Sequence, residues 1–165
     1  MITMRSEEVN LNTVYLAAPF FDDMAHTIPG QVERIDQAVH SLNMNPTIDG
    51  VYSPKDNQSS EYEEFSKDWQ IQTYRADLLH LNLADVVVSL LPFNENGTMD
   101  DGTAFEVGYA VGQNIPVITV NEGNGDNPTN LMIAQSGTAF LDHISDLATY
   151  DFNQLPLNDC TNQVF

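Results

Sequence analysis

The run Ala84–Leu91, ADVVVSLL, constrains the fold of this chain more than any other segment. It is apolar almost throughout and rich in β-branched valine, and it shows no alternation of polar and apolar residues. Such a run is typical of a central parallel strand that is buried on both faces. Pro92 follows directly and ends the strand. A strand of this kind requires a layer of helices on each side of its sheet.

The segments on either side alternate between strand and helix patterns. Strands are predicted at residues 13–18, 51–54, 115–120 and 138–141, and helices at 29–42, 61–83, 102–113, from 131 onward and at 144–150. Pro29 suits a first helical turn. Phe65, Trp69 and Leu79 are candidate core contacts of the long second helix. The alternation predicts an α/β fold with a parallel sheet covered on both faces.

Three polar loops follow the predicted strands. They are KDNQSSEYEE (55–64), NENGTMDDG (94–102) and NEGNGDNPTN (121–130). In open parallel sheets, ligands bind outside the carboxyl ends of the strands. We therefore expect the three loops to meet at one edge of the sheet and to hold the functional site.

Glu106 lies in the predicted helix after the second of these loops, and its pattern allows two interpretations. Thr103-x-x-Glu106 matches a capping box, in which the glutamate accepts a hydrogen bond from the backbone. Alternatively, the helix dipole holds Glu106 ionised, and an ionised carboxylate can attack the anomeric carbon of a sugar. Retaining glycosidic chemistry then requires a second carboxyl group about 5 Å away.

Asp100 and Asp77 are the candidates for that second carboxyl group. Asp100 directly precedes the helix of Glu106, and Asp77 lies among leucines on the long helix before the central strand. Asp77 can instead form an ion pair with Arg75 on the helix surface. Tyr15, in the first strand, can orient a carboxylate with its hydroxyl group or can be an ordinary core tyrosine.

Four motifs occur in the order and spacing of a known family. VYLAAPFF, the helix of Asp77, DDGTAFEVGYA and NLMIAQ resemble the nucleoside 2-deoxyribosyltransferases, from about Thr13 to the C-terminus. The resemblance implies a flavodoxin-like sheet of about five parallel strands in one domain, residues 13–165, preceded by a flexible segment, 1–12. It also implies exchange of the base of a 2'-deoxyribonucleoside for another free base, as in nucleotide salvage.

The same resemblance implies roles for individual residues. The catalytic glutamate of the family falls on Glu106, its supporting tyrosine on Tyr15, its base-contacting aspartate on Asp77 and a further aspartate on Asp100. No metal or organic cofactor is required. We expect a covalent ester between the sugar and Glu106, formed and resolved with two inversions and hence overall retention.

The remaining implied residues contact the substrate, some of them across an interface. Asn130 and Met132 of NLM reach the sugar pocket of an adjacent subunit, as does the terminal carboxylate, here on Phe165, where some family members end in tyrosine. Gln58 falls on a loop glutamine of the family. We therefore expect a homo-oligomer built from dimers, up to a hexamer, with shared active sites.

Two aromatic residues and the base specificity leave alternatives open. Phe20 and Phe21 either provide an apolar surface for the planar base or pack in the core. AFEVG and NLMIAQ resemble the purine-restricted class, whereas KDNQ resembles the class that accepts purines and pyrimidines. These signals conflict, and AFEVG and NLMIAQ together favour a purine preference slightly.

The charge restricts the partners. Five Lys and Arg against 24 Asp and Glu leave a formal net charge of −19, which repels nucleic acid and anionic membranes. It favours a neutral substrate and suggests a salt-rich or acid-tolerant cell, or simple solubility. The single Cys160 excludes an intramolecular disulfide. With no leader and no apolar run of membrane-spanning length, we expect a cytoplasmic protein.

Two other functions fit the same pattern. The first is an N-glycoside hydrolase, which passes the sugar of a nucleoside or nucleotide to water. The scarcity of basic residues argues against its nucleotide form, although backbone N–H groups can also bind phosphate. The second is a nucleotide-binding module without catalytic activity, because fold alone does not define function.

Overall fold

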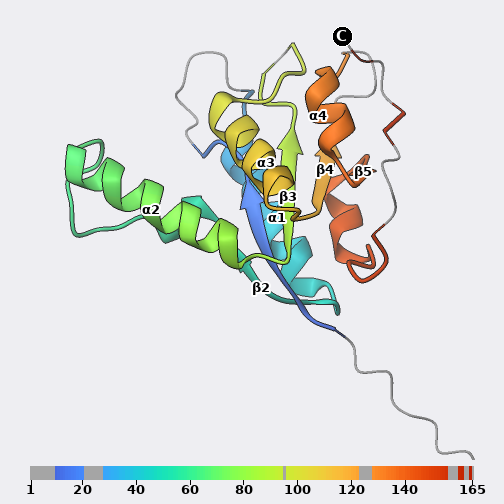
Figure 1. Cartoon of the computed structure of the whole chain (residues 1–165), viewed down its shortest axis with the longest axis horizontal. Coiled ribbons are helices and arrows are strands. Elements are labelled where there is room, and N and C mark those ends of the chain that lie inside the picture. Colours follow the sequence, from blue (N-terminus) through green and yellow to red (C-terminus); the bar gives the residue numbers. More distant parts are fainter. Residues whose placement is uncertain are drawn as a thin grey trace, which may run out of the picture.

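A parallel sheet of five strands forms the centre of the protein (Figure 1). The computed structural model describes residues 10–20, 28–94, 96–122, 128–155, 160–161 and 164. The strands lie in the order β2-β1-β3-β4-β5, and every neighbouring pair is parallel. The predicted α/β fold is confirmed, and it is flavodoxin-like.

The elements follow one another in βα alternation. The strands are β1 (Asn12–Ala17), β2 (Ile48–Tyr52), β3 (Val86–Leu91), β4 (Val117–Asn121) and β5 (Ala139–Leu141). The α-helices are α1 (Gln31–Met44), α2 (Lys67–Leu83), α3 (Asp101–Gly112) and α4 (Leu131–Ser136), and the 3-10 helices are η1 (Pro54–Asn57) and η2 (Ile144–Ala148). Strand β3 is buried along its whole length, as its valine run predicts.

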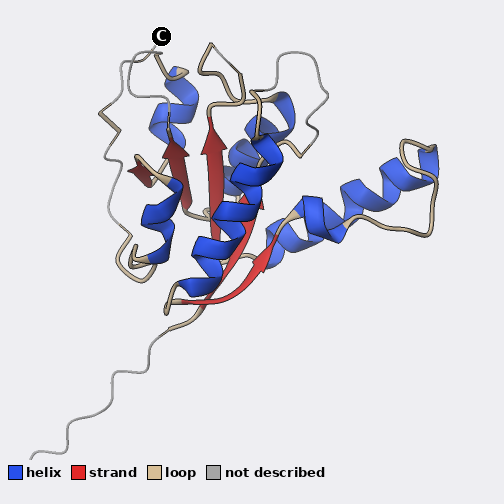
Figure 2. Cartoon of the chain, turned by 180° about the vertical axis from the view of Figure 1, so that it is seen from behind, coloured by secondary structure: helices blue, strands red, loops and turns tan. Residues whose placement is uncertain are grey.

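Alternate residues of the strands point to opposite faces of the sheet and form two apolar layers, one on each face. Figure 2 shows that helices cover both faces. Val14 and Leu16 of β1 face α1 and η2, whereas Tyr15 and Ala17 face α2 and α3. This follows from the two-residue period of a strand. Tyr15 is fully buried on the α2/α3 face.

Two helices begin later than predicted. Helix α1 begins at Gln31 rather than Pro29, because Gly30 has a left-handed φ of 79° that no right-handed helix includes. Helix α2 begins at Lys67 rather than residue 61, because the Ser66 side chain accepts a hydrogen bond from Trp69 N at 3.2 Å and caps the helix.

Two of the three core contacts predicted for α2 are wrong. Trp69 is buried, but Phe65 is 59% exposed and Leu79 is 56% exposed. Figures 1 and 2 show the reason: α2 projects away from the body of the protein, so few of its side chains meet another layer. Apolar side chains on the outer side of such a helix, such as Leu79, therefore stay exposed in the described part of the chain.

Two further predictions shift in position or type. Strand β2 spans Ile48–Tyr52 instead of the predicted 51–54, and the 3-10 helix η1 begins at Pro54, the last residue of the predicted strand, and continues into the predicted loop. The predicted last helix is the 3-10 helix η2. Tyr52 consequently lies at the carboxyl end of its strand, paired in register with Tyr15 of β1.

Arg34 of α1 ties together the carboxyl ends of two central strands. Its side chain is 13% exposed, and its guanidinium group donates to Leu91 O at 2.7 Å, to Pro92 O at 2.9 Å and to Glu122 Oε2 at 3.0 Å. Glu122 Oε1 accepts in turn from Ile144 N at 3.3 Å. One half-buried cation thus joins α1, β3, the segment after β4 and η2.

We expect Arg34→Met to lower the free energy of unfolding by roughly 1.5–3 kcal/mol, because it removes the charged donor of Glu122 Oε2, Leu91 O and Pro92 O. Urea unfolding measures the loss. Lys67→Met is the matched control, since it removes an equal charge from an exposed position at the start of α2. Equal destabilisation by the two variants would show that only net charge matters.

Candidate active site

Four polar side chains from four elements meet on the α2/α3 face of the sheet. They are Tyr15 of β1, Tyr52 of β2, Asp77 of α2 and Glu106 of α3. Tyr15, Asp77 and Glu106 line a cavity of about 180 Å³ together with Tyr74, Leu78, Leu81, Gly102 and Phe105. The cavity adjoins the point where strand order reverses between β1 and β3, which is where open α/β sheets bind ligands.

Tyr15 and Glu106 form a short hydrogen bond, in which the Tyr15 hydroxyl donates to Glu106 Oε1 at 2.5 Å. The capping-box interpretation of Glu106 is wrong. The N-cap of α3 is Asp100, whose carboxylate accepts from Gly102 N at 3.0 Å and from Thr103 N at 3.3 Å. Because Asp100 caps the helix, Glu106 lies in its second turn and its side chain is directed to the phenol.

Asp77 has the equivalent relation to Tyr52. The Tyr52 hydroxyl donates to Asp77 Oδ1 at 2.9 Å, and within the described part of the chain Asp77 forms no ion pair with Arg75. Tyr52 was missed by the sequence analysis. Its signal was a second tyrosine at the carboxyl end of a strand, where the parallel register places it beside Tyr15 with ring centroids 5.5 Å apart.

Burial dominates the electrostatics of both carboxyl groups. Burial raises the pKa of Glu106 to about 8, with smaller contributions from the charges of Asp77 and Asp100, and against the hydrogen bond from Tyr15, which lowers it. Burial also raises the pKa of Asp77, against the hydrogen bond from Tyr52 and the charge of His80. The expectation that the helix dipole holds Glu106 ionised is wrong, because the dipole acts within the first turn.

Both phenols remain hydrogen-bond donors. Burial and the neighbouring carboxylates raise the pKa values of Tyr15 and Tyr52 far above the ordinary value for tyrosine. Each hydroxyl therefore keeps its proton over the whole physiological range. The site thus contains two half-buried acids, each held by one protonated phenol.

A second cavity extends the site along the edge of the sheet. It has a volume of about 450 Å³ and is lined by Pro19, Phe93, Asn94, Thr98, Met99, Asp100, Asp101 and Gly102. Gly102 lines both cavities. Because small-molecule sites usually measure about 300–1,000 Å³, the cavity of Glu106 is small by itself, whereas the neighbouring cavity falls within this range.

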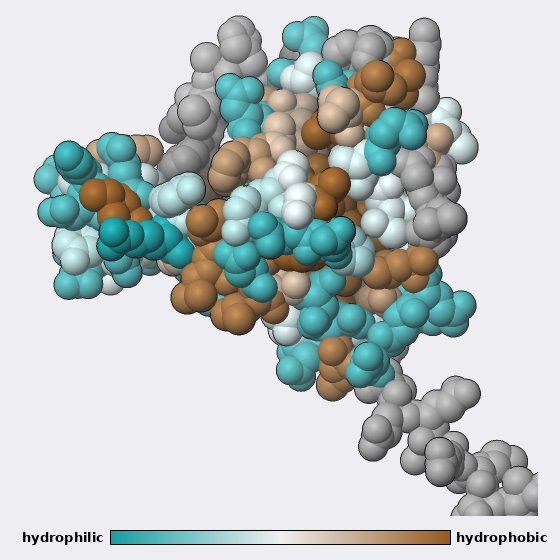
Figure 3. Space-filling view, in the orientation of Figure 1, coloured by the Kyte–Doolittle hydropathy of each residue, from teal (hydrophilic) through white to brown (hydrophobic). Residues whose placement is uncertain are grey.

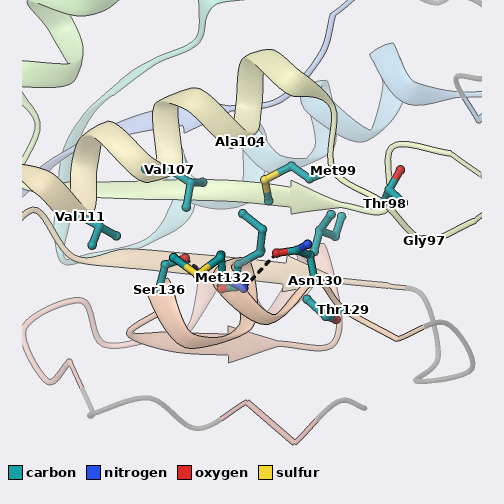
Figure 4. Close-up of a pocket in the computed structure, with 13 residues that line it drawn as sticks. Gly97, Thr98, Met99, Ala104, Val107, Val111, Thr129, Asn130, Met132 and Ser136 are labelled. Carbon is teal, nitrogen blue, oxygen red and sulfur yellow. Dashed lines mark hydrogen bonds between the residues drawn. The ribbon is translucent and has the colours of Figure 1, made fainter. Parts of the chain in front are cut away.

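Asn130 and Met132 lie on the other side of α3. They line a largely apolar cavity of about 490 Å³ between α3 and α4 (Figure 4). Asn130 Oδ1 caps α4 by accepting from Met132 N at 2.9 Å, and Met132 is 74% exposed. This cavity uses residues 104, 107, 108 and 111 of α3, whereas the cavity of Glu106 uses residues 102, 105 and 106. The chain therefore does not bring Asn130 and Met132 into contact with Glu106.

The structure does not place the other expected residues at the cavity of Glu106. Gln58 Nε2 donates to Pro54 O at 2.5 Å, and Gln58 Oε1 accepts from Thr73 at 3.5 Å, so Gln58 braces η1 against α2. Phe20 packs against the apolar layer of α1, which favours its core role. Phe21 and Phe165 lie outside the described residues.

Two searches bear on cofactors and membranes. Among the described residues, no group of three or more His, Cys, Asp and Glu side chains is arranged to bind a metal ion. No helix in the described ranges combines the length and hydrophobicity that a bilayer span requires.

Comparison with known proteins places the chain beside one group of enzymes. The sequence profile described as nucleoside 2-deoxyribosyltransferase matches residues 14–155. The nucleoside deoxyribosyltransferase of Limosilactobacillus fermentum is 30% identical over 164 residues, 91% of this chain and 92% of the relative. That of Lactobacillus johnsonii is 36% identical over 135 residues, 75% and 87% of the two chains.

A solved structure agrees with the sequence relatives. The 2-deoxyribosyltransferase of Bacillus psychrosaccharolyticus superposes with a TM-score of 0.71 at 30% identity, over 88% of this chain and 97% of that one. The similarity therefore covers the sheet and the helices that carry Asp77 and Glu106.

Burial of Glu106 predicts a pH-dependent cost to stability. Between the ordinary carboxyl pKa of 4.5 and about 8, the folded protein binds a proton that the unfolded chain releases, so this contribution to stability falls as pH rises. Glu106→Gln removes the cost. Its gain in melting temperature over the wild type should be larger at pH 8.5 than at pH 5 by roughly 5 °C or more, at about 1.4 kcal/mol per pKa unit.

Glu64→Gln, at an exposed position before α2, controls for the change in net charge. Melting curves are compared at one protein concentration, since any association shifts the midpoint. A gain for Glu106→Gln that matches the control at both pH values would contradict a buried, neutral Glu106.

Proposed function

The chain belongs to the nucleoside 2-deoxyribosyltransferase family and is a transferase, and from this premise we propose that it moves the deoxyribosyl group of a 2'-deoxyribonucleoside to another free purine or pyrimidine base. The observation that carries the proposal is the buried Glu106, held by Tyr15 in a cavity that also contains Asp77. Transfer occurs in two displacements at one carbon atom.

Glu106 performs the first displacement. Its Oε1 is engaged by Tyr15, so Oε2 attacks C1' from the face opposite the base. The C1'–N bond breaks, its electron pair goes to the departing base, and Asp77 gives that base nitrogen a proton. The products are the free base, an ester between C1' and Glu106, and an ionised Asp77.

The incoming base performs the second displacement. Asp77, now a carboxylate, accepts the proton from a nitrogen of this base, and the nitrogen attacks C1'. The ester bond to Glu106 breaks and its electron pair returns to the carboxylate. Two inversions leave the configuration at C1' unchanged.

The proposed nucleophile is active only as an anion. Because burial raises the pKa of Glu106 to about 8, the anionic fraction grows as pH rises through neutrality. The hydrogen bond from Tyr15 favours the anion and opposes that shift. Asp77 must hold a proton at the same time, and burial, which raises its pKa, helps it to do so.

Charge supports a nucleoside substrate over a nucleotide. Within the described ranges, no lysine or arginine lines the cavity of Glu106 or the cavity of Asp100. Arg34 is bound to Glu122, and Lys55 to Asp36 and Asp56. A phosphate group would therefore meet an acidic site without a counter-charge. A 2'-deoxy sugar is also easier to transfer than a ribose. A 2'-hydroxyl withdraws electrons and would destabilise the oxocarbenium-like transition state.

Mass spectrometry tests the covalent step. After exposure to deoxyinosine without an acceptor base, we expect a mass increase of one deoxyribosyl group, and peptide mapping should locate it on Glu106. Adding adenine should remove the adduct and release deoxyadenosine. Glu106→Gln should form no adduct and lose at least about 10³-fold in transfer rate, as when a catalytic nucleophile is removed.

The same experiment separates the alternatives. Free deoxyribose as the main product, with or without adenine, would identify a hydrolase. Binding of deoxyinosine without turnover in both the wild type and Glu106→Gln would identify a binding module. An adduct on another residue would contradict the assignment of Glu106.

We further propose a homo-oligomer in which Asn130 and Met132 complete the site of a neighbouring subunit. Their cavity faces away from Glu106, and Met132 is exposed. Exposed apolar side chains gather along α2 and α3 (Figure 3), and they include Ile71, Leu79, Leu83, Phe105 and Val111. A surface of this kind is typical of contact with another protein.

Subunit mixing tests the shared site. Glu106→Ala and the double variant Asn130→Ala/Met132→Ala should each be nearly inactive alone. After joint dissociation and reassociation, mixed dimers contain one intact site out of two, so activity should return to roughly a quarter of the wild-type value. No recovery, with mixed oligomers verified by native mass spectrometry, would show that the residues do not act across an interface.

A further inference from the structure

His80 is a titratable side chain that the mechanism above leaves without a role. It lies one helical turn after Asp77 on α2, and its ring stacks on Tyr52 with centroids 3.8 Å apart and planes inclined by 10°. Its Nδ1 is 2.8 Å from Ala76 O. Since a carbonyl oxygen only accepts, Nδ1 carries a proton and donates it to Ala76 O.

The Tyr52 ring is held from both sides. His80 lies against it at 3.8 Å, and Tyr15 stacks with it at 5.5 Å with an interplanar angle of 24°. Rotation of the ring is restricted, so the Tyr52 hydroxyl stays directed at Asp77 Oδ1 at 2.9 Å. The stack Tyr15–Tyr52–His80 therefore connects the two phenols that hold the two acids.

We propose that His80 is a positioning residue, which holds the Tyr52 hydroxyl on Asp77 and thereby sets how readily Asp77 releases its proton to the departing base. The proposal rests on the proposed function, in which Asp77 protonates that base. His80 does not line the cavity of Glu106; it acts through the Tyr52 ring and through its charge.

Stacking and charge act on Asp77 in the same direction. A hydrogen bond from Tyr52 favours the ionised form of Asp77, and so does a positive charge on His80. The titratable groups that face this arrangement are Asp77 on α2, Tyr52 on β2, Tyr15 on β1 and Glu106 on α3. His80 thus counteracts the burial that would otherwise make Asp77 too weak an acid.

Two substitutions separate the contributions. His80→Phe keeps a ring on Tyr52 but removes the charge, and His80→Ala removes both. His40→Ala is the control, because His40 is an exposed imidazole on α1, at the opposite face of the sheet. The measurement is the rate of base release in a single turnover as a function of pH.

For His80→Phe, we expect the alkaline limb of the profile to move to higher pH, with the maximal rate within about twofold of wild type. For His80→Ala, the limb moves further and the maximal rate falls roughly tenfold, since part of a general-acid contribution is lost. KM should change by less than about twofold. Profiles of both variants that match His40→Ala would overturn the proposal, and so would equal losses of rate in His80→Phe and His80→Ala.

A second measurement does not depend on turnover. In a Glu106→Gln background, a ¹³C NMR titration of the Asp77 carboxyl carbon should show a higher pKa in His80→Phe and a still higher one in His80→Ala. If the wild type transfers no deoxyribose, the proposed function fails, and this titration alone decides the positioning of Asp77: a shifted pKa supports it and an unchanged pKa overturns it.

Discussion

The hydrogen bond between the buried Tyr15 hydroxyl and Glu106 is the interaction on which the site depends. It exists because the alternation of β1 directs Tyr15 to the α2/α3 face, while Val14 and Leu16 face α1. It also requires Asp100 to cap α3, which leaves the Glu106 carboxyl free to turn toward the sheet. The alternation of β1 and the Asp100 cap of α3 together place the Glu106 carboxyl group against the Tyr15 hydroxyl.

A second pair of the same kind is formed by Tyr52 and Asp77. The two acids are alike in this respect but differ in their other neighbours. Burial raises the pKa values of both groups, but each has different neighbours: Glu106 faces two further carboxylates, whereas Asp77 faces His80. In low dielectric surroundings, such differences decide which acid keeps its proton. Here the neighbours favour the protonated form of Glu106 and the ionised form of Asp77, which is the reverse of the distribution that the proposed first displacement uses.

Helix α3 divides the functional surface into two parts. One side presents Glu106 to α2, and the other side borders the apolar cavity with Asn130 and Met132. Asn130 and Met132 lie on the side of α3 away from Glu106. If they act at a site with Glu106, they must therefore act at the site of a second chain. The projecting α2 and its exposed leucines provide apolar surface of the kind that such contacts bury.

The sequence by itself determined the layered α/β fold and the three residues that meet at the cavity of Glu106. The valine run of β3 and the alternation of strands and helices were sufficient for the parallel sheet, and motif order was sufficient to select Tyr15, Asp77 and Glu106. The sheet could be predicted because apolar runs and periodicity are local signals, whereas the three residues were selected by the resemblance of their motifs to one family. The first residues of α1 and α2 were harder to predict from the sequence. Helix α1 starts where it does because of the backbone conformation of Gly30, and α2 because the Ser66 side chain caps it.

Only the tertiary structure decided which partner each of these side chains has. The local sequence also allowed Glu106 to cap its helix and Asp77 to pair with Arg75. In the structure, Glu106 is bound by Tyr15 and Asp77 by Tyr52 instead. Tyr52 and His80 have no motif; they join the site through strand register and ring stacking between segments distant in the chain. Phe65 and Leu79 are apolar but exposed, because burial depends on what a helix faces. Periodicity specifies a face, whereas packing between elements specifies the contact.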